Sequence, residues 1–336
     1  MPYNATLRSR LEKRIYILDG AMGTMIMHAS PTEADFRGER FVNHPVALKG
    51  CNDILSLTAP EIISSIHHRY LQSGADIIST NTFNSNSLSL SAYHLSDIAP
   101  EIARAGARVA RSAADVFAAA QGLEGERKPL VAGSMGPTNI SLSMQDSMNP
   151  EADFDRMAEA YRLQTLALMK GGVDLLLLET IFDTLNVKAA ASGMLQGFTE
   201  AGRRIPVMVS ATLGENGRLF SGETLEQFVG DIEHLDPISI GLNCGFGLKA
   251  LMPYIRQLSV ITERLISIHP NAGLPDAFGC YRDTPSRMVS ELAPLMSEGG
   301  INIVGGCCGT TPDHISMIAT EARNHTPRPL PPRKDA

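Results

Sequence analysis

The sequence predicts an α/β protein, a (β/α)8 TIM barrel with an elaborated loop after its first strand. Three observations support this prediction. Short apolar, β-branched runs recur eight times, segments with helix signals separate them, and polar or sulfur-bearing residues stand where the runs end. Each run is apolar along most of its length instead of alternating, which is typical of strands buried on both faces of a parallel sheet.

The predicted strands are distributed over the whole chain. They cover residues 15–20, 75–82, 129–136, 173–180, 206–213, 237–244, 264–271 and 301–308. Parallel strands need a crossover of roughly a dozen residues or more, and each gap between these runs can hold one. We therefore expect strand and helix to alternate eight times, with the strands closing into a barrel.

Helix signals mark the segments between the strands. Residues 60–74 start with a proline in the first turn and end at a glycine, and residues 153–172 and 223–235 also have helical patterns. The longest gap, residues 21–74, contains polar turn material and is predicted to form the elaborated first loop. An open doubly wound sheet is the alternative fold. Such a sheet would more naturally carry a full glycine-rich dinucleotide fingerprint after its first strand, and DGAMGT matches only part of one.

The domain organisation predicted is one barrel followed by a tail. Residues 1–325 are assigned to the barrel, and residues 326–336 are rich in proline and basic residues, as in an extended linker. Such a linker suggests a chain cut from a longer protein, although a natural stand-alone protein stays open.

Composition and charge exclude several classes of function. The net charge of −7 argues against a nucleic-acid partner, whose binders usually carry a basic face. No apolar run approaches the roughly 20 residues of a membrane span, and the first residues lack the pattern of a signal peptide. Five cysteines in a chain of 336 residues fit a reducing compartment, so we expect a cytoplasmic protein.

The candidate active-site residues are those at the ends of the predicted strands, because the active sites of such barrels lie at this face. They are Asp19, Asn81, Thr82, Ser134, Glu179, Thr212, Asn243, Cys244, Asn271, Cys307 and Cys308. The strand bodies are apolar while their ends are polar, which predicts a site at the barrel mouth.

Three of these residues are cysteines. Cys244 ends the sixth predicted strand, and Cys307 and Cys308 end the eighth, so their side chains converge over one mouth. Three thiolates suit Zn²⁺, and a catalytic zinc has three protein ligands and one open position. The competing interpretation is that a cysteine is a small buried hydrophobic residue, which we expect for Cys51 and Cys280.

A second interpretation of residues 305–315, GGCCGTTPDHI, is an anion site. A glycine-rich turn that enters a helix can bind phosphate, as the loops after strands seven and eight do in many barrels. The chain would then be a phosphate-binding isomerase or aldolase. No strand-end lysine is available for a Schiff base, which weakens the aldolase version.

Two acidic strand ends face the cysteines in this scheme. Asp19 and Glu179 could act as a base or hold a substrate ammonium group, although Asp19 could also merely cap a turn. Glu179 follows an apolar strand, where an unpaired carboxylate would be costly to bury. The backbone amides of the next segment could receive a carboxylate, and its residues are Gly20, Ala21, Met22, Gly23 and Thr24. Together these groups predict a clamp for an amino acid with a thiol side chain.

Nine stretches closely resemble the homocysteine-binding barrel of cobalamin-dependent methionine synthase, within the homocysteine S-methyltransferase family. They are LDGAMGTMIM, DFRGERF, LKGCNDIL, GADIISTNTFNSNS, GSMGPTN, LLLLETIFDTLNVKAA, IGLNCGFG, HPNAGLP and NIVGGCCGTTPDHI. The resemblance covers the chain from about residue 8 to about residue 325.

The resemblance implies a function and a ligand set. It implies that Cys244, Cys307 and Cys308 bind zinc and carry the catalysis, with the sulfur of homocysteine as the fourth ligand. Asn271 matches the residue that can take the open zinc position. The remaining assignments concern homocysteine: Asp19 and Glu179 hold its amino group, the amides of residues 20–24 hold its carboxylate, and Ser134 is added to the substrate-binding set.

The methyl donor is expected to be methylcobalamin on another domain or partner, because one barrel fills the chain and leaves no room for cobalamin-binding or folate-binding modules. The alternatives are a stand-alone homocysteine S-methyltransferase that uses betaine or S-methylmethionine, and a zinc- or thiol-binding module without turnover. Two positions depart from the family pattern, since Ser79 replaces a glutamate and Phe246 lies in NCGFG where the family often has NCALG.

Overall fold

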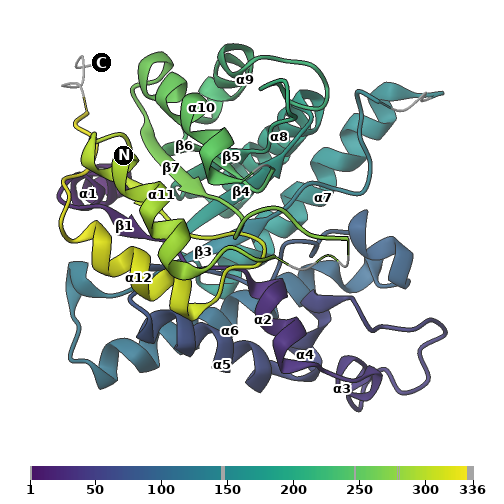
Figure 1. Cartoon of the computed structure of the whole chain (residues 1–336). Coiled ribbons are helices and arrows are strands. Elements are labelled where there is room, and N and C mark those ends of the chain that lie inside the picture. Colours follow the sequence, from purple (N-terminus) through teal and green to yellow (C-terminus); the bar gives the residue numbers. More distant parts are fainter. Residues whose placement is uncertain (1, 145–147, 246, 278, 280, 331–336) are drawn as a thin grey trace.

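The computed structural model describes residues 2–144, 148–245, 247–277, 279 and 281–330. Its eight parallel strands form one sheet in the order β1-β8-β7-β6-β5-β4-β3-β2. A parallel bridge between Leu18 and Ile77 joins β1 to β2 and closes the sheet into a barrel. The predicted (β/α)8 TIM barrel is therefore confirmed (Figure 1).

The strands are shorter than the apolar runs that predicted them. Their bounds are β1 Tyr16–Ile17, β2 Ile77–Ser79, β3 Leu130–Met135, β4 Leu175–Ile181, β5 Val207–Ala211, β6 Ser239–Asn243, β7 Leu265–His269 and β8 Ile303–Val304. The last residues of several runs leave the sheet to build the loops of the barrel mouth. After β8, for example, the amides of Gly305 and Gly306 bond to the carbonyl oxygens of Ile268 and Asp19 at 3.0 Å each.

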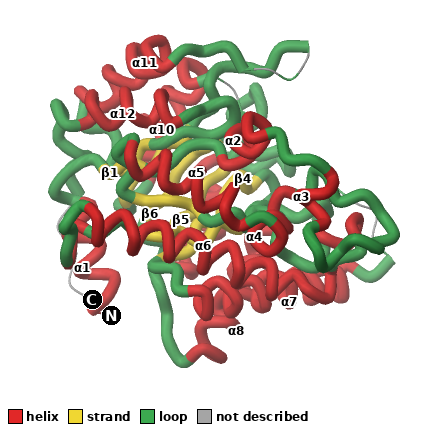
Figure 2. The backbone as a smooth tube through the Cα atoms, turned by 90° about the horizontal axis from the view of Figure 1, so that it is seen from below, coloured by secondary structure: helices red, strands yellow, loops and turns green. Residues whose placement is uncertain are grey.

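Helices surround the strands, as Figure 2 shows from below. The outer helices are α5 Pro60–Gln72, α6 Ala99–Ala120, α7 Pro150–Gly171, α8 Thr184–Ala201, α9 Leu225–Ile232, α10 Leu248–Ile261, α11 Pro285–Ser297 and α12 Pro312–Ala322. The three helices predicted at 60–74, 153–172 and 223–235 are confirmed, the last as α9 followed by a 3-10 turn, Glu233–Leu235. No helix among the described residues has both the length and the apolar character needed to cross a membrane.

The first loop is elaborated, as predicted, and has helices of its own. They are α2 Met22–Ala29, α3 Glu33–Arg37, the 3-10 turn Asn52–Ile54 and α4 Leu55–Thr58. The Arg37 guanidinium donates to the carbonyl oxygens of Phe41, Val42, His44 and Val46. The loop thus gets its shape from one side chain that satisfies several backbone acceptors.

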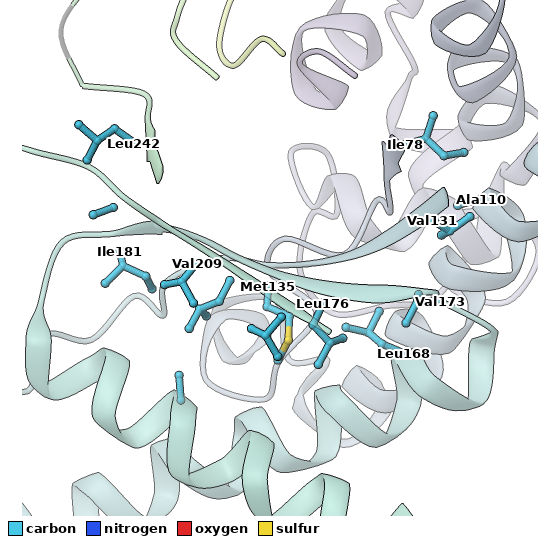
Figure 3. Packing of buried hydrophobic residues seen from close by; sticks show 14 of the residues in the cluster. Ile78, Ala110, Val131, Met135, Leu168, Val173, Leu176, Ile181, Val209 and Leu242 are labelled. Carbon is cyan, nitrogen blue, oxygen red and sulfur yellow. The ribbon is translucent and has the colours of Figure 1, made fainter. Parts of the chain in front are cut away.

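The core has two layers, which follow from the two faces of each strand. Leu176 packs outward against the helices, as Figure 3 shows, whereas Leu175 and Leu177 belong to a separate cluster inside the barrel. Successive side chains of a strand point to opposite faces, so a strand buried on both sides must be apolar throughout. This explains why continuous apolar runs predicted the strands.

The amino ends of the strands are covered by both ends of the chain. Leu7 and Leu11 of α1, Pro2–Leu11, join the cluster inside the barrel, and Leu330 packs against it. Arg328 is 9% exposed, and its guanidinium donates to the carbonyl oxygens of Ser259, Thr262 and Arg264. The boundary at residue 325 stays a prediction, but the first residues of the predicted tail lie against the barrel.

Candidate metal and substrate site

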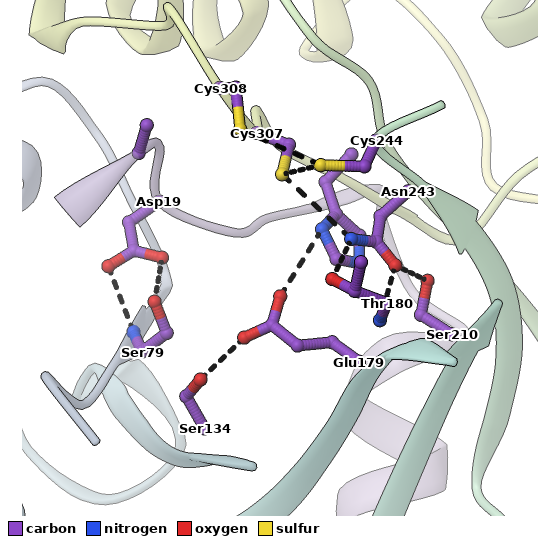
Figure 4. Close-up of polar contacts among 12 residues, drawn as sticks. Asp19, Ser79, Ser134, Glu179, Thr180, Ser210, Asn243, Cys244, Cys307 and Cys308 are labelled. Carbon is purple, nitrogen blue, oxygen red and sulfur yellow. Dashed lines mark hydrogen bonds and ion pairs between the residues drawn. The ribbon is translucent and has the colours of Figure 1, made fainter. Parts of the chain in front are cut away.

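The three strand-end cysteines meet at the barrel mouth (Figure 4). Cys244 directly follows β6, and Cys307 and Cys308 lie just beyond β8. The Cys244 Sγ lies 2.9 Å from the Cys307 Sγ and 3.6 Å from the Cys308 Sγ, and all three sulfurs lie within 4.8 Å of one another. The three are free thiols, and they form a group that could hold a metal ion.

The cysteine pair sits on a turn that is fixed from both sides. The Cys307 amide donates to Pro270 O at 2.8 Å, and the Cys308 carbonyl accepts from the Ala272 amide at 2.9 Å. The Thr310 hydroxyl donates to the Cys307 carbonyl at 2.7 Å. At Gly306, a Cβ atom would lie 2.4 Å from the Thr310 Oγ1, so a glycine is required for this close approach.

The donor set of this cluster fits zinc. Hydrogen bonds from Cys244 and Cys307 lower the pKa of Cys308 to about 3, while hydrogen bonding within the cluster and burial raise the pKa of Cys307. Hydrogen bonding within the cluster therefore favours the thiolate form of Cys308. Sulfur ligands in this number are those of a zinc site with an open fourth position.

Asn271 lies between the two residues that hold the cysteine turn. Its side-chain nitrogen donates to Gly245 O at 3.3 Å, whereas its Oδ1 is buried and has no hydrogen-bond partner among the described residues. A buried amide oxygen without a partner has bonding capacity for a ligand. The predicted role of Asn271 at the open zinc position stays a prediction.

Asp19 lies at the mouth with both carboxylate oxygens bound by one residue. It is 2% exposed, and it accepts hydrogen bonds from the Ser79 amide at 2.9 Å and the Ser79 hydroxyl at 2.8 Å. Burial raises the pKa of Asp19 to about 8. Ser79, which departs from the family pattern, therefore orients a predicted substrate residue.

Glu179 is the second buried acid of the mouth. Ser134 Oγ donates to it at 2.5 Å, and its other oxygen lies 3.9 Å from the His269 Nδ1. Burial raises the pKa of Glu179 to about 7. Ser134, predicted to bind substrate, is thus placed where it orients Glu179. Two acids with raised pKa values provide a site that would gain from a substrate ammonium group.

The segment predicted to hold a carboxylate forms the start of α2. The Ala21 amide is already bonded to Thr310 Oγ1 at 3.1 Å, and the Thr24 hydroxyl accepts from the Gly309 amide at 3.0 Å. The amides of Met22, Gly23 and Thr24 lie in the first turn, where a helix leaves its NH groups without internal partners. These three amides, and not that of Ala21, are therefore free to receive an anion.

The geometry disfavours the phosphate interpretation. Helix α12 begins at Pro312, which has no NH, and its end is closed by a capping box between Thr311 and His314. The Gly309 amide is bonded to Thr24. The amides of Gly309 and Thr311, which a phosphate would need at this turn, are thus used within the protein.

Sequence reasoning left several residues of the site without a role. Asn243 accepts from the Thr180 amide at 3.0 Å and from the Ser210 hydroxyl at 2.7 Å, and it donates to the Thr180 hydroxyl at 2.8 Å. Thr180 has a φ of 60°, next to a register shift between β4 and β5 that aims Glu179 at the mouth. Its position at a strand end marked Asn243 as a candidate in the sequence. Nothing in the sequence indicated the positive φ of Thr180.

Tyr281 was also missed, because it lies in a loop without a pattern. Its side chain interacts with Cys308 and helps to lower the pKa of that thiol. Two residues discussed from the sequence, Phe246 and Cys280, lie outside the described part of the chain. Cys51 is buried, 4% exposed, as expected for a cysteine that packs as a hydrophobic residue.

Three thiols and two buried acids at the mouth of a (β/α)8 barrel are suited to an enzyme that acts on a thiol substrate. Residues 16–322 match the model of the homocysteine S-methyltransferase family, and this chain belongs to that family. It is an enzyme family that acts on homocysteine, and the match covers the three cysteines and both acids.

Solved structures of similar fold include the homocysteine methyltransferase MmuM from Escherichia coli. Its oxidized form has a TM-score of 0.71 at 22% identity, with 92% of this chain and 96% of that chain covered. Its metallated form has a TM-score of 0.70 at 22% identity, with 95% and 99% covered. At 22% identity, this structural similarity supports the assignment of the fold alone.

Proposed function

We propose that this chain binds homocysteine at Cys244, Cys307 and Cys308 through a zinc ion and methylates its sulfur with methylcobalamin carried by another domain or partner. The convergence of the three thiols is the observation that carries the proposal. When bound, zinc lowers the pKa of a thiol that it coordinates, so that homocysteine is held as the nucleophilic thiolate at neutral pH.

The residues of this chain position the substrate for the reaction. We assign the ammonium group of homocysteine to Asp19 and Glu179, and its carboxylate to the amides that open α2. An ammonium group favours the ionised acids, so each acid that is protonated in the empty site releases its proton on binding. In the reaction, the new bond joins the homocysteine sulfur to the methyl carbon. The bond to the donor breaks, and its electron pair stays with the donor.

The rim of the mouth supports a macromolecular donor. Ten large apolar side chains are exposed among the described residues, and seven of them follow strands on this side of the barrel. These seven are Met27, Val42, Met144, Met148, Leu185, Phe220 and Leu274. Exposed apolar side chains on the loops of this face offer contacts to a protein partner, which a small soluble donor would not need.

The second candidate is a stand-alone enzyme with betaine or S-methylmethionine as the donor. The observation in its favour is the length of the match, since the chain covers almost all of the Escherichia coli enzyme and is almost entirely covered by it. The third candidate, a zinc- or thiol-binding module, would bind homocysteine without turnover.

A turnover assay separates the three candidates. The zinc-loaded full chain is incubated with homocysteine and, in separate reactions, with methylcobalamin, betaine or S-methylmethionine, and methionine is measured. We expect product from methylcobalamin alone. Equal turnover with betaine or S-methylmethionine would make the donor assignment wrong, and homocysteine binding without product from any donor would favour the module.

A further inference from the structure

A second pocket opens among the loops of the barrel mouth, away from the loops that carry Cys244, Cys307 and Cys308. It has a volume of about 300 Å³ and is lined by residues 50–53, 83–84, 89–90, 93 and 137–139. These residues belong to the loops after β1, β2 and β3, whereas the cysteines follow β6 and β8. The volume is at the lower end of the range for small-molecule sites.

The wall of this pocket contains a buried carboxylate with unused bonding capacity. Asp53 is 3% exposed, and its Oδ2 accepts from the Asn84 amide at 2.8 Å and from the Ser85 hydroxyl at 2.7 Å. Its Oδ1 forms no hydrogen bond with any residue that the structure describes. This oxygen is open to the pocket and can accept from a bound donor, which would stabilise a carboxylate that is otherwise mostly buried.

The other lining groups indicate the charge of the missing partner. Asp53 is the one Asp, Glu, Lys, Arg or His in the lining, so no basic side chain there balances it. Phe83 and Tyr93 line the same space, and aromatic rings attract cations.

We propose that this pocket binds a small organic cation that carries N–H donors, such as an alkylammonium or alkylguanidinium compound. The Asp53 Oδ1 accepts from the cationic head, and Phe83 and Tyr93 lie against the alkyl part. The lining contains none of the residues assigned to zinc or homocysteine, and the proposal does not depend on the identity of the methyl donor.

The test uses the zinc-loaded full chain and ligand-observed NMR titration with butylguanidinium. Butanol and butyrate are the neutral and anionic comparisons. The decisive variant is Asp53→Asn, which keeps the oxygen that Asn84 and Ser85 use but puts an NH₂ donor in place of Oδ1. Asp97→Asn, at an exposed acid of the neighbouring 3-10 turn Ser96–Ile98, is the matched control.

We expect butylguanidinium to bind at least about 10-fold more tightly than butanol or butyrate, since a buried charge pair contributes more than a neutral contact. Asp53→Asn should weaken it about 10-fold or more, and Asp97→Asn should leave it unchanged. Equal binding of butanol, an unchanged affinity in Asp53→Asn, or competition by homocysteine would each overturn the proposal.

Discussion

The carboxyl ends of the barrel strands carry thiols and buried acids, whereas the amino ends are covered by apolar side chains and one satisfied arginine. At the mouth, burial raises the pKa values of Asp19 and Glu179, and Thr180 and Cys244 have positive φ angles of 60° and 54°. At the other end, Arg328 bonds to backbone carbonyls at 2.7 to 3.0 Å.

This difference shows where the fold stores strain and where it gains stability. A positive φ costs a residue other than glycine about 1–3 kcal/mol, and Asn243 holds Thr180 in that conformation through two hydrogen bonds. The amino ends contain one described residue of this kind, Asp236, which has a φ of 44° in the turn before β6. An aspartate tolerates this conformation better than the β-branched Thr180 does. Substitutions at the two ends should therefore have separable effects on chemistry and on stability.

The largest effect is expected for Cys307→Ala. Zinc content should fall from about one ion per chain to near zero, and turnover should be lost, because two thiols cannot complete the ligand set. Metal analysis after dialysis measures the first, and circular dichroism verifies the fold. Cys51→Ala, at a buried cysteine outside the site, is the control and should keep its zinc. Full zinc retention in Cys307→Ala would contradict the assigned ligand set.

Arg328→Ala tests the opposite end. Three carbonyl oxygens lose a charged donor, so the free energy of unfolding should fall by about 3 kcal/mol while zinc content stays unchanged. Denaturant titration measures this, with Arg323→Ala, an exposed arginine in the same segment, as the control. A stability equal to that of the control variant would mean that the tail does not contribute to the barrel.

The residues at the carboxyl ends of the strands could be predicted from the sequence better than those at the amino ends. The strand positions follow from continuous apolar runs, and barrel closure then requires that strand ends such as Cys244 and Cys307 meet at one face. Arg328 could not be predicted in this way, because a basic residue in a proline-rich stretch has the composition of a solvated tail. Its position depends on carbonyl groups that the tertiary fold presents at the carboxyl end of α10 and just before β7.

Within the mouth, the residue types were predictable but their pairings were not. The serine partners of Asp19 and Glu179 come from neighbouring strands, and their contacts depend on register and on the bulge after Leu178. A shift by one residue would turn Ser79 away from the mouth. Such details follow from backbone geometry, which a single sequence does not specify.

A smaller effect concerns the pH dependence of stability in the metal-free protein. The pKa of Asp19 is about 8 in the folded chain against an ordinary value of 3.8, so between these values the folded state holds a proton that the unfolded state lacks. Stability from this group is complete at low pH and is lost as pH rises toward 8, by about 1.4 kcal/mol per pH unit. Asp19→Asn should remove this slope. Denaturant titrations between pH 5 and 8 measure it, and identical slopes in both proteins would contradict the raised pKa.

The smallest effect is expected for Ser79→Ala, which probes the departure from the family pattern. The Ser79 hydroxyl stabilises the ionised form of Asp19, so its loss should raise the pKa of Asp19 further and weaken homocysteine binding about 5-fold at pH 7, equivalent to about 1 kcal/mol. Calorimetric titration of the zinc-loaded protein measures the affinity. The deficit should shrink at pH 9, where Asp19 is ionised in both proteins. A deficit that stays the same at pH 9 would show that Ser79 acts on binding through packing and not through the charge of Asp19.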